Sequence, residues 1–165
     1  MATSSTSAST SRNQGRTTVF DTARAADVEQ LCALLGILFG QEAEFAPDAD
    51  KQRRALEMIL ADPRIGRIFV AREGERLAAM ASLLYTVSTA EGGKAALFED
   101  LVVLPEFRGK GIGTALLRHV IDAARKEGLT RVTLLTDGGN KRAQALYRKM
   151  GFVASTMTAM RAKLY

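Results

Sequence analysis

A glycine-rich turn between an apolar strand and a long amphipathic helix sets the strongest limit on the architecture of this chain. The turn reads Arg-Gly-Lys-Gly-Ile-Gly-Thr over residues 108–114. Glycines leave the backbone accessible, and the first turn of a helix has unpaired N–H groups and a partial positive charge. A phosphate group binds readily in such a place, and Arg108 and Lys110 add positive charge. The alternative is a tight strand-to-helix turn that binds nothing.

The two common nucleotide-binding patterns do not fit this turn. A P-loop needs four residues between its first glycine and a Gly-Lys-Ser/Thr sequence, which is absent here. The dinucleotide pattern Gly-x-Gly-x-x-Gly would need a glycine at Thr114 or Leu116. The turn therefore predicts an anion site of another kind at the start of a helix.

Hydrophobic periodicity predicts alternating strands and helices along the chain. Strands are expected at residues 17–22, 67–72, 76–88, 95–104 and 131–136, helices at 25–40, 50–60, 111–127 and 140–150, and one or two terminal strands at 152–164. The central hairpins imply antiparallel pairing, and the later strand–helix–strand alternation implies parallel pairing. We therefore expect a single α/β domain with a mixed central sheet and helices on both faces.

Length and composition agree with one domain that is not anchored in a membrane. The chain has 165 residues, 47% of them hydrophobic, and no apolar run approaches the ~20 residues that cross a bilayer. Residues 1–16 are Ser/Thr-rich and are expected to form a disordered tail before a domain at 17–165. A single cysteine favours a reducing compartment, and we expect a cytoplasmic protein. One cysteine and one histidine exclude a metal site built from these ligands.

Positive charge is concentrated in the second half of the chain. The net charge is +5, and residues 104–150 contain ten Lys/Arg against four Asp/Glu. This asymmetry indicates an anionic partner. Few aromatic residues are interleaved with the basic ones and no reading helix is recognisable, so a small polyphosphate ligand is as good a candidate as nucleic acid. The concentration of this charge around a phosphate-sized turn weakens the nucleic-acid alternative, and we expect no nucleic-acid partner.

Three linked motifs resemble those of the GNAT family of N-acetyltransferases. The Arg-Gly-x-Gly-x-Gly turn after a Val-x-Pro sequence resembles the family's pyrophosphate-binding motif. The strand at 97–103 precedes it, and the pattern from Asn140 through Ala143 and Tyr147 to Gly151-Phe152 resembles the second cofactor-side motif. The similarity extends over most of residues 17–164, and it is nearest to the diamine/polyamine branch.

The resemblance implies acetyl-CoA as acyl donor, without a metal. The implied cofactor contacts are Leu101, Val102, Val103, Arg108, Gly109, Lys110, Gly111, Ile112, Gly113, Thr114, Asn140, Ala143 and Tyr147. The glycines would hold the pyrophosphate, and the strand backbone would hold the pantetheine arm. Helix capping alone would also explain Asn140.

Two residues match the catalytic positions of the family. Tyr147 matches the general acid that protonates the CoA sulfur, although a core tyrosine on a helix stripe is the alternative. Glu99 matches the base, acting through a water, and a structural ion pair with an arginine is the alternative. Asp100 follows directly, and strand alternation predicts that it points to the opposite face from Glu99.

The acceptor is expected to be a small cationic amine, such as a polyamine, a thialysine-like compound or an amino acid. The segment 41–50 contains four acids and no base, and Glu42 and Glu44 would attract such a cation. Tyr85 and Asp100 complete the expected substrate contacts, while a solvated acidic loop is the alternative for the segment. A peptide or protein acetyltransferase, or an idle acyl-CoA sensor, remains an alternative function. Family members often dimerise, so a homodimer is one expected state.

Overall fold

The computed structural model describes residues 17–41 and 46–164 of the chain. The expected tail at 1–16, the acidic residues Glu42 and Glu44, and Tyr165 lie outside the described residues. Within the described part, no helix is long and apolar enough to cross a membrane.

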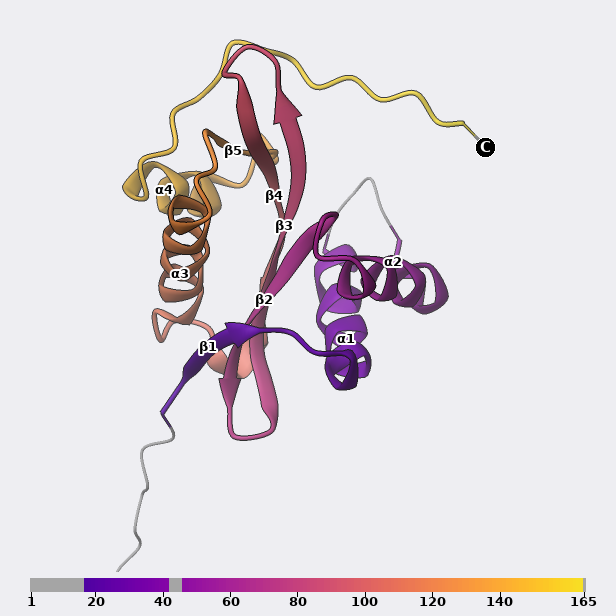
Figure 1. The fold of residues 1–165 in the computed structure, drawn as a ribbon. Helices are drawn as coiled ribbons and strands as arrows, with labels where there is room; N and C mark the ends of the chain where they lie inside the picture. The colour runs from indigo at the N-terminus through magenta and orange to yellow at the C-terminus, as the bar shows by residue number, and fades with distance from the viewer. Residues whose placement is uncertain (1–16, 42–45, 165) are drawn as a thin grey trace, which may run out of the picture.

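A five-stranded sheet forms the centre of the molecule (Figure 1). Its strands are β1 (Val19–Thr22), β2 (Gly66–Glu73), β3 (Arg76–Ser88), β4 (Gly93–Val103) and β5 (Val132–Leu134), and they lie side by side in chain order. The first four are antiparallel, and β5 runs parallel to β4. The expected combination of central hairpins and a later parallel strand is confirmed.

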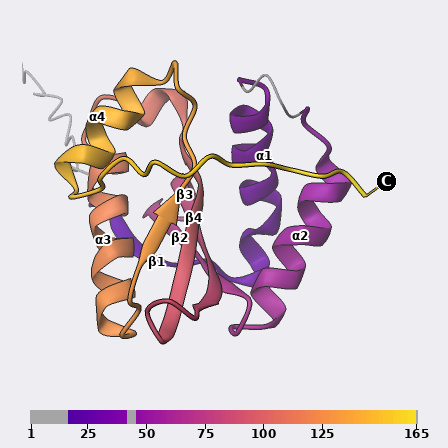
Figure 2. The same cartoon turned by 90° about the horizontal axis from the view of Figure 1, so that it is seen from above.

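Helices cover both faces of this sheet (Figure 2). The short 3-10 helix η1 (Ala25–Asp27) leads into α1 (Val28–Phe39), and α1 and α2 (Ala49–Ala61) lie on one face. After β4, the 3-10 helix η2 (Pro105–Phe107) leads to α3 (Ile112–Lys126), which covers the other face together with α4 (Lys141–Lys149). The predicted mixed sheet between two helical layers is therefore confirmed.

The hydrophobic core consists of two clusters separated by the sheet. One contains Phe69 and Leu83 with the buried side of α3, including Leu116, and the other contains Ile68 and Met80 with the buried side of α1. Neighbouring strand residues enter opposite clusters because successive side chains point to opposite faces. This double burial explains why β2 and β3 read as nearly continuous apolar runs rather than as alternating ones.

The terminal strands predicted at 152–164 are wrong. The described residues after Gly151 form no strand, and their large apolar side chains are exposed, as at Val153 (90%) and Leu164 (92%). Alternation indicates only that a segment is able to pair, whereas a strand also needs a neighbour for its N–H and C=O groups. In the described chain this segment pairs with no strand of the sheet.

Candidate active site

A split between β4 and β5 forms the centre of the candidate site. The two strands pair only from Ala96 opposite Val132 to Phe98 opposite Leu134. β4 continues to Val103, and among the described strands none lies beside its last residues on that side. An extended ligand therefore finds an open strand edge at 99–103, which leads directly to the glycine turn.

The glycine turn lies at the end of this edge and starts α3. Gly109 (φ 76°) and Gly111 (φ 79°) are in the left-handed region, where a residue with a side chain is strained. A Cβ added at either position would meet no atom within 4 Å, so open space lies in front of this backbone. At Gly113, an added Cβ would stand 3.2 Å from Cγ2 of Val103. The third glycine therefore lets α3 approach β4 closely.

The other predicted residues of the turn anchor it or surround it with charge. Ile112 is buried in the core beneath α3, and Thr114 is half-buried two residues further along the chain. The Nε atom of Arg108 donates a 3.0 Å hydrogen bond to the carbonyl oxygen of Val103, which ties the turn to the end of β4. Lys110 is exposed. The turn thus combines accessible backbone with two cationic side chains, as an anion site requires.

The strand residues Leu101, Val102 and Val103 precede the turn. Val102 is buried against the α1 side of the sheet, whereas Leu101 and Val103 are half-buried on the α3 side. Their side chains therefore fix β4 between the two cores, and their backbone forms the open edge.

Tyr147 of α4 lies where β4 and β5 separate. Its ring packs edge-on against Phe98, the last residue of β4 that pairs with β5, with 6.3 Å between centroids. It also packs against Phe152 at 5.9 Å. Burial raises the pKa of the Tyr147 hydroxyl, which makes no hydrogen bond to any residue that the structure describes. The protonated hydroxyl of Tyr147 therefore lies at the split between β4 and β5, where it is available to donate a hydrogen bond.

Asn140 caps the helix that carries Tyr147. Its Oδ1 atom accepts a 3.0 Å hydrogen bond from the backbone N–H of Ala143. This contact stabilises the first turn of α4. The capping role of Asn140 is therefore observed, while the predicted cofactor contacts of Asn140 and half-buried Ala143 remain predictions.

A β-bulge places Asp100 differently from simple alternation. Ser82 lies opposite Glu99 in the register with β3, whereas Met80 lies opposite Val102, so β4 has one extra residue between them. Asp100 lies in this bulge, and its φ of 57° is the one positive φ of a non-glycine residue in the described chain. Ser82 donates a 3.0 Å hydrogen bond to Oδ2 of Asp100.

The expected opposite orientation of the two carboxylates is therefore wrong. Residues that oppose each other in a sheet point to the same face, so Glu99 lies on the face of Ser82. Asp100 reaches the same serine because the bulge rotates its side chain. Both acids lie around Ser82, at the point where β4 loses its β5 neighbour.

The carboxyl group of Asp100 is poorly solvated. Burial raises its pKa above the ordinary value, and only the hydrogen bond from Ser82 opposes this effect. Ser82 itself is 1% exposed. A cation that binds beside this group would stabilise its ionised form, since an uncompensated buried charge is costly.

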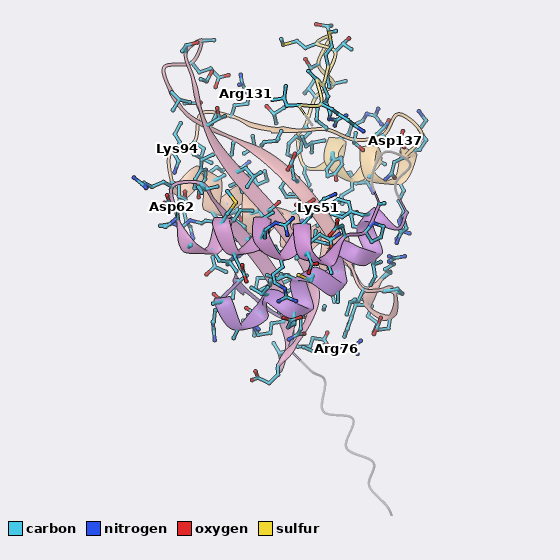
Figure 3. All side chains as sticks on the ribbon, turned by 90° about the vertical axis from the view of Figure 1, so that its right-hand side faces the viewer. Lys51, Asp62, Arg76, Lys94, Arg131 and Asp137 are labelled. Atoms are coloured by element: carbon cyan, nitrogen blue, oxygen red, sulfur yellow. The ribbon has the colours of Figure 1, made fainter. Side chains whose placement is uncertain are left out.

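Tyr85 belongs to a polar network at the other end of α3. Its hydroxyl donates a 2.6 Å hydrogen bond to Glu127 and accepts one of 3.1 Å from Nε of Arg67. Arg67 and Glu127 form an ion pair at 2.8 Å, and the ammonium group of Lys94 (labelled in Figure 3) lies 3.4 Å from the Tyr85 ring centroid. Burial and the bond to Glu127 raise the pKa of Tyr85 to about 12. These contacts explain Tyr85 structurally, and its substrate contact stays a prediction.

Sequence reasoning missed Ser82 and the bulge. A signal for Ser82 was present, because it is the only polar residue in the run 78–84. The bulge gave no such signal, since the backbone conformation of Asp100 depends on the register between β3 and β4. The surface hollows beside α2 have volumes of about 170 Å³ and are lined by other residues. In residues 17–41 and 46–164, no cluster of three His, Cys, Asp or Glu is arranged to hold a metal.

Comparison with known sequences identifies the family. Residues 30–152 match the sequence profile of the Acetyltransferase (GNAT) family, and they include the bulge, the glycine turn and Tyr147. The chain belongs to the GNAT family. It is therefore an acyltransferase of that family, and the resemblance of the three motifs is confirmed.

Individual GNAT relatives cover the chain to different extents. Streptothricin acetyltransferase of Streptomyces lavendulae is 32% identical over 162 residues, which cover 84% of this chain and 82% of the relative. Thialysine N-epsilon-acetyltransferase of Mus musculus is 33% identical over 69 residues, or 42% of this chain and 41% of that protein. A solved integron cassette protein from the mobile metagenome of Cole Harbour Salt Marsh superposes with a TM-score of 0.77 at 29% identity, covering 88% and 90% of the two chains.

Proposed function

We propose that this GNAT protein transfers an acetyl group from acetyl-CoA to the primary amine of a small cationic molecule, in a ternary complex. The observation that carries the proposal is the continuous path from Tyr147 along the open edge of β4 to the glycine turn. An extended donor with a thioester at one end and a pyrophosphate further along fits this path. We propose a cytoplasmic location, which the single cysteine of the chain supports.

The glycine turn holds the pyrophosphate in this proposal. Open space lies in front of the left-handed backbone at Gly109 and Gly111, where backbone N–H groups would meet the pyrophosphate, and the dipole of α3 adds positive potential. Arg108 and Lys110 contribute full charges at the rim. The backbone of β4 at Leu101–Val103 then hydrogen-bonds the pantetheine arm as a neighbouring strand would.

Glu99 and Tyr147 handle the two protons of the reaction. Glu99 accepts, through a water, the proton that leaves the amine nitrogen, and the nitrogen lone pair attacks the thioester carbonyl carbon. The carbon–sulfur bond breaks, and the Tyr147 hydroxyl delivers a proton to the departing sulfur. The raised pKa of Tyr147 suits this step because the phenol stays protonated at neutral pH.

Asp100 binds the acceptor cation. Its desolvated carboxyl group has a hydrogen-bond donor in Ser82 but no cationic partner among the described residues. A protonated amine supplies the missing positive charge and thereby favours the ionised carboxylate. Glu42 and Glu44 add attraction for a polycation in the proposal. The names of the two relatives given above refer to different acceptors, which supports an amine substrate without selecting one.

The test is release of free thiol from acetyl-CoA in the presence of polyamines, thialysine, amino acids and streptothricin. We expect turnover with at least one small cationic amine. Absence of turnover with every amine, together with intact CoA binding, would instead support the idle sensor. Turnover with peptides alone would support a peptide acetyltransferase.

The role of Tyr147 has a matched control in Tyr85, because both are half-buried tyrosines with raised pKa values. We expect Tyr147→Phe to lower kcat roughly 100-fold, within the usual range for loss of a general acid, with little change in acetyl-CoA affinity. Tyr85→Phe should leave kcat within a few-fold. Equal turnover of wild type and Tyr147→Phe would remove Tyr147 from the acid role.

A further inference from the structure

Ser82 is a buried polar residue in an otherwise apolar stretch of β3. It is 1% exposed, and the other residues of 78–84 are all apolar. It lies opposite Ile68 of β2 and Glu99 of β4, and Ile68 belongs to the core cluster beneath α1. Residues that oppose each other across strands share a face, so Ser82 points to the α1 side of the sheet. A hydroxyl group there is costly without a hydrogen bond, and its partner is Asp100.

Asp100 has a backbone conformation and surroundings that both cost free energy. Its φ of 57° lies in the left-handed region, and a bulge position of this kind usually holds glycine. Its carboxyl group is poorly solvated, and burial raises its pKa. Neither property stabilises the fold, and residues in such strained conformations cluster at functional sites. The two costs therefore indicate a carboxyl group that serves binding or chemistry.

The two carboxyl oxygens of Asp100 have different surroundings. Oδ2 accepts the 3.0 Å hydrogen bond from buried Ser82. Oδ1 accepts no hydrogen bond from the residues that the structure describes. It is nevertheless in contact with solvent, because in the described chain only Nε of Arg72 is a fully buried side-chain atom without a hydrogen-bond partner. The carboxyl group thus has one oxygen anchored in the core and one oxygen accessible to a ligand.

We propose that Ser82 is a positioning residue of the acceptor site: its hydroxyl group fixes Oδ2 of Asp100, so that Oδ1 faces the ammonium group of the acceptor. This inference rests on the proposed function, in which Asp100 binds the acceptor cation. Without the hydroxyl group, the carboxylate would lose its one hydrogen-bond donor among the described residues and could rotate about χ2. The ionised form would also be less stable, because a hydrogen bond to a carboxylate favours its charged form. Ser82 thus acts on acceptor binding through Asp100.

The position of Ser82 places the acceptor and the donor on opposite faces of the sheet. Ser82 lies on the face that α1 and α2 cover (Figure 2). Tyr147 packs against the core cluster beneath α3, on the other face. The two faces meet where β4 loses its β5 neighbour, directly after Phe98. A cation held by Asp100, two residues further along β4, therefore approaches the end of the proposed donor path from the α1 side.

Acceptor kinetics of Ser82→Ala are the first test, with spermidine, thialysine and streptothricin as amines. The amine KM should rise about tenfold, or about 1.4 kcal/mol, which is the order expected for a lost hydrogen bond to a charged group. The kcat should stay within about threefold and the KM of acetyl-CoA should not change, because ground-state binding of the amine alone is affected. Ser88→Ala is the matched control. Ser88 is a buried serine of the same strand, accepts a 3.3 Å hydrogen bond from the N–H of Glu91, and should leave the amine KM unchanged.

A double-mutant cycle separates positioning from a general effect on the fold. Asp100→Asn removes the charge and keeps the left-handed backbone, which asparagine tolerates. In that background, Ser82→Ala should change kcat/KM for the amine by less than about twofold, because the group on which it acts is gone. An equal loss in both backgrounds, or an unchanged amine KM in Ser82→Ala, refutes the inference and leaves the proposed function in place if the wild type turns over. A wild type that acetylates no amine refutes the proposed function, and the inference with it.

Discussion

Gly111 allows the proposed anion site and the fold to be tested separately, because Gly128 is a matched control at the opposite end of α3. Gly111 has φ 79° and Gly128 has φ 71°, and an added Cβ meets no atom within 4 Å at either position. Alanine in the left-handed region costs about 1–2 kcal/mol, which the lower entropy of the unfolded chain offsets by about 0.4–1 kcal/mol. Both Gly→Ala variants should therefore lose about 1 kcal/mol of stability, or roughly 2–4 °C in Tm.

The two variants should differ in binding acetyl-CoA. The methyl group of Gly111→Ala enters the space in front of the turn, where the proposed pyrophosphate approaches the backbone. A loss of at least about 1.4 kcal/mol there corresponds to a tenfold weaker Kd. Gly128→Ala changes no atom near the turn, so its Kd should stay within about twofold. Isothermal titration with acetyl-CoA and thermal unfolding of both variants measure the two effects.

The reasoning is refuted if Gly111→Ala binds acetyl-CoA as tightly as the control does at the same Tm. Equal weakening in both variants would show that a general loss of order in α3, rather than blocked phosphate access, controls the affinity.

Three further perturbations test other parts of the structure. Asp27→Asn disrupts a buried bidentate pair with Arg72, whose two hydrogen bonds measure 2.9 Å, and should cost about 3 kcal/mol in urea unfolding. Arg72 lowers the pKa of Asp27 in the folded state, so the pair contributes fully to stability above the ordinary pKa of 3.8, and this contribution is lost as the pH falls further. If the difference in free energy of unfolding between wild type and Asp27→Asn stays constant at acidic pH, this reasoning is contradicted. Tyr85→Phe should cost about 1–2 kcal/mol through the lost bond to Glu127, whereas a changed amine KM at unchanged Tm would support the predicted substrate contact. Leu116→Ala should cost about 2–5 kcal/mol because the side chain is fully buried, and a loss below about 1 kcal/mol would show that α3 collapses onto the cavity.

Local sequence patterns were sufficient to predict those features whose conformation depends on residues close in sequence. The periodicity of residues 111–127 predicted α3 within one residue at each end. The glycine turn was recognisable because positive φ, an open backbone and a helix start are all local properties. The cap formed by Asn140 is equally local, since its partner is three residues away.

Such local patterns do not predict the register between neighbouring strands. The bulge at Asp100 arises because β4 has one more residue than β3 across the stretch between Val102 and Glu99. Alternation along one strand contains no information about this mismatch, and it therefore assigned the two acids to opposite faces. The hydrogen bond between Ser82 and Asp100 joins residues 18 apart and exists only through the pairing.

The sequence by itself determined the family, the order of the elements from β1 to α4 and the glycine turn, because these follow from short-range spacing. Tertiary structure decided which acids share a face, what surrounds Tyr85 and whether residues 152–164 form a strand. Each of these depends on which partner is present across the sheet. Hydrogen bonding and burial between strands are satisfied by residues distant in sequence, so a segment becomes a strand only where such a partner lies beside it.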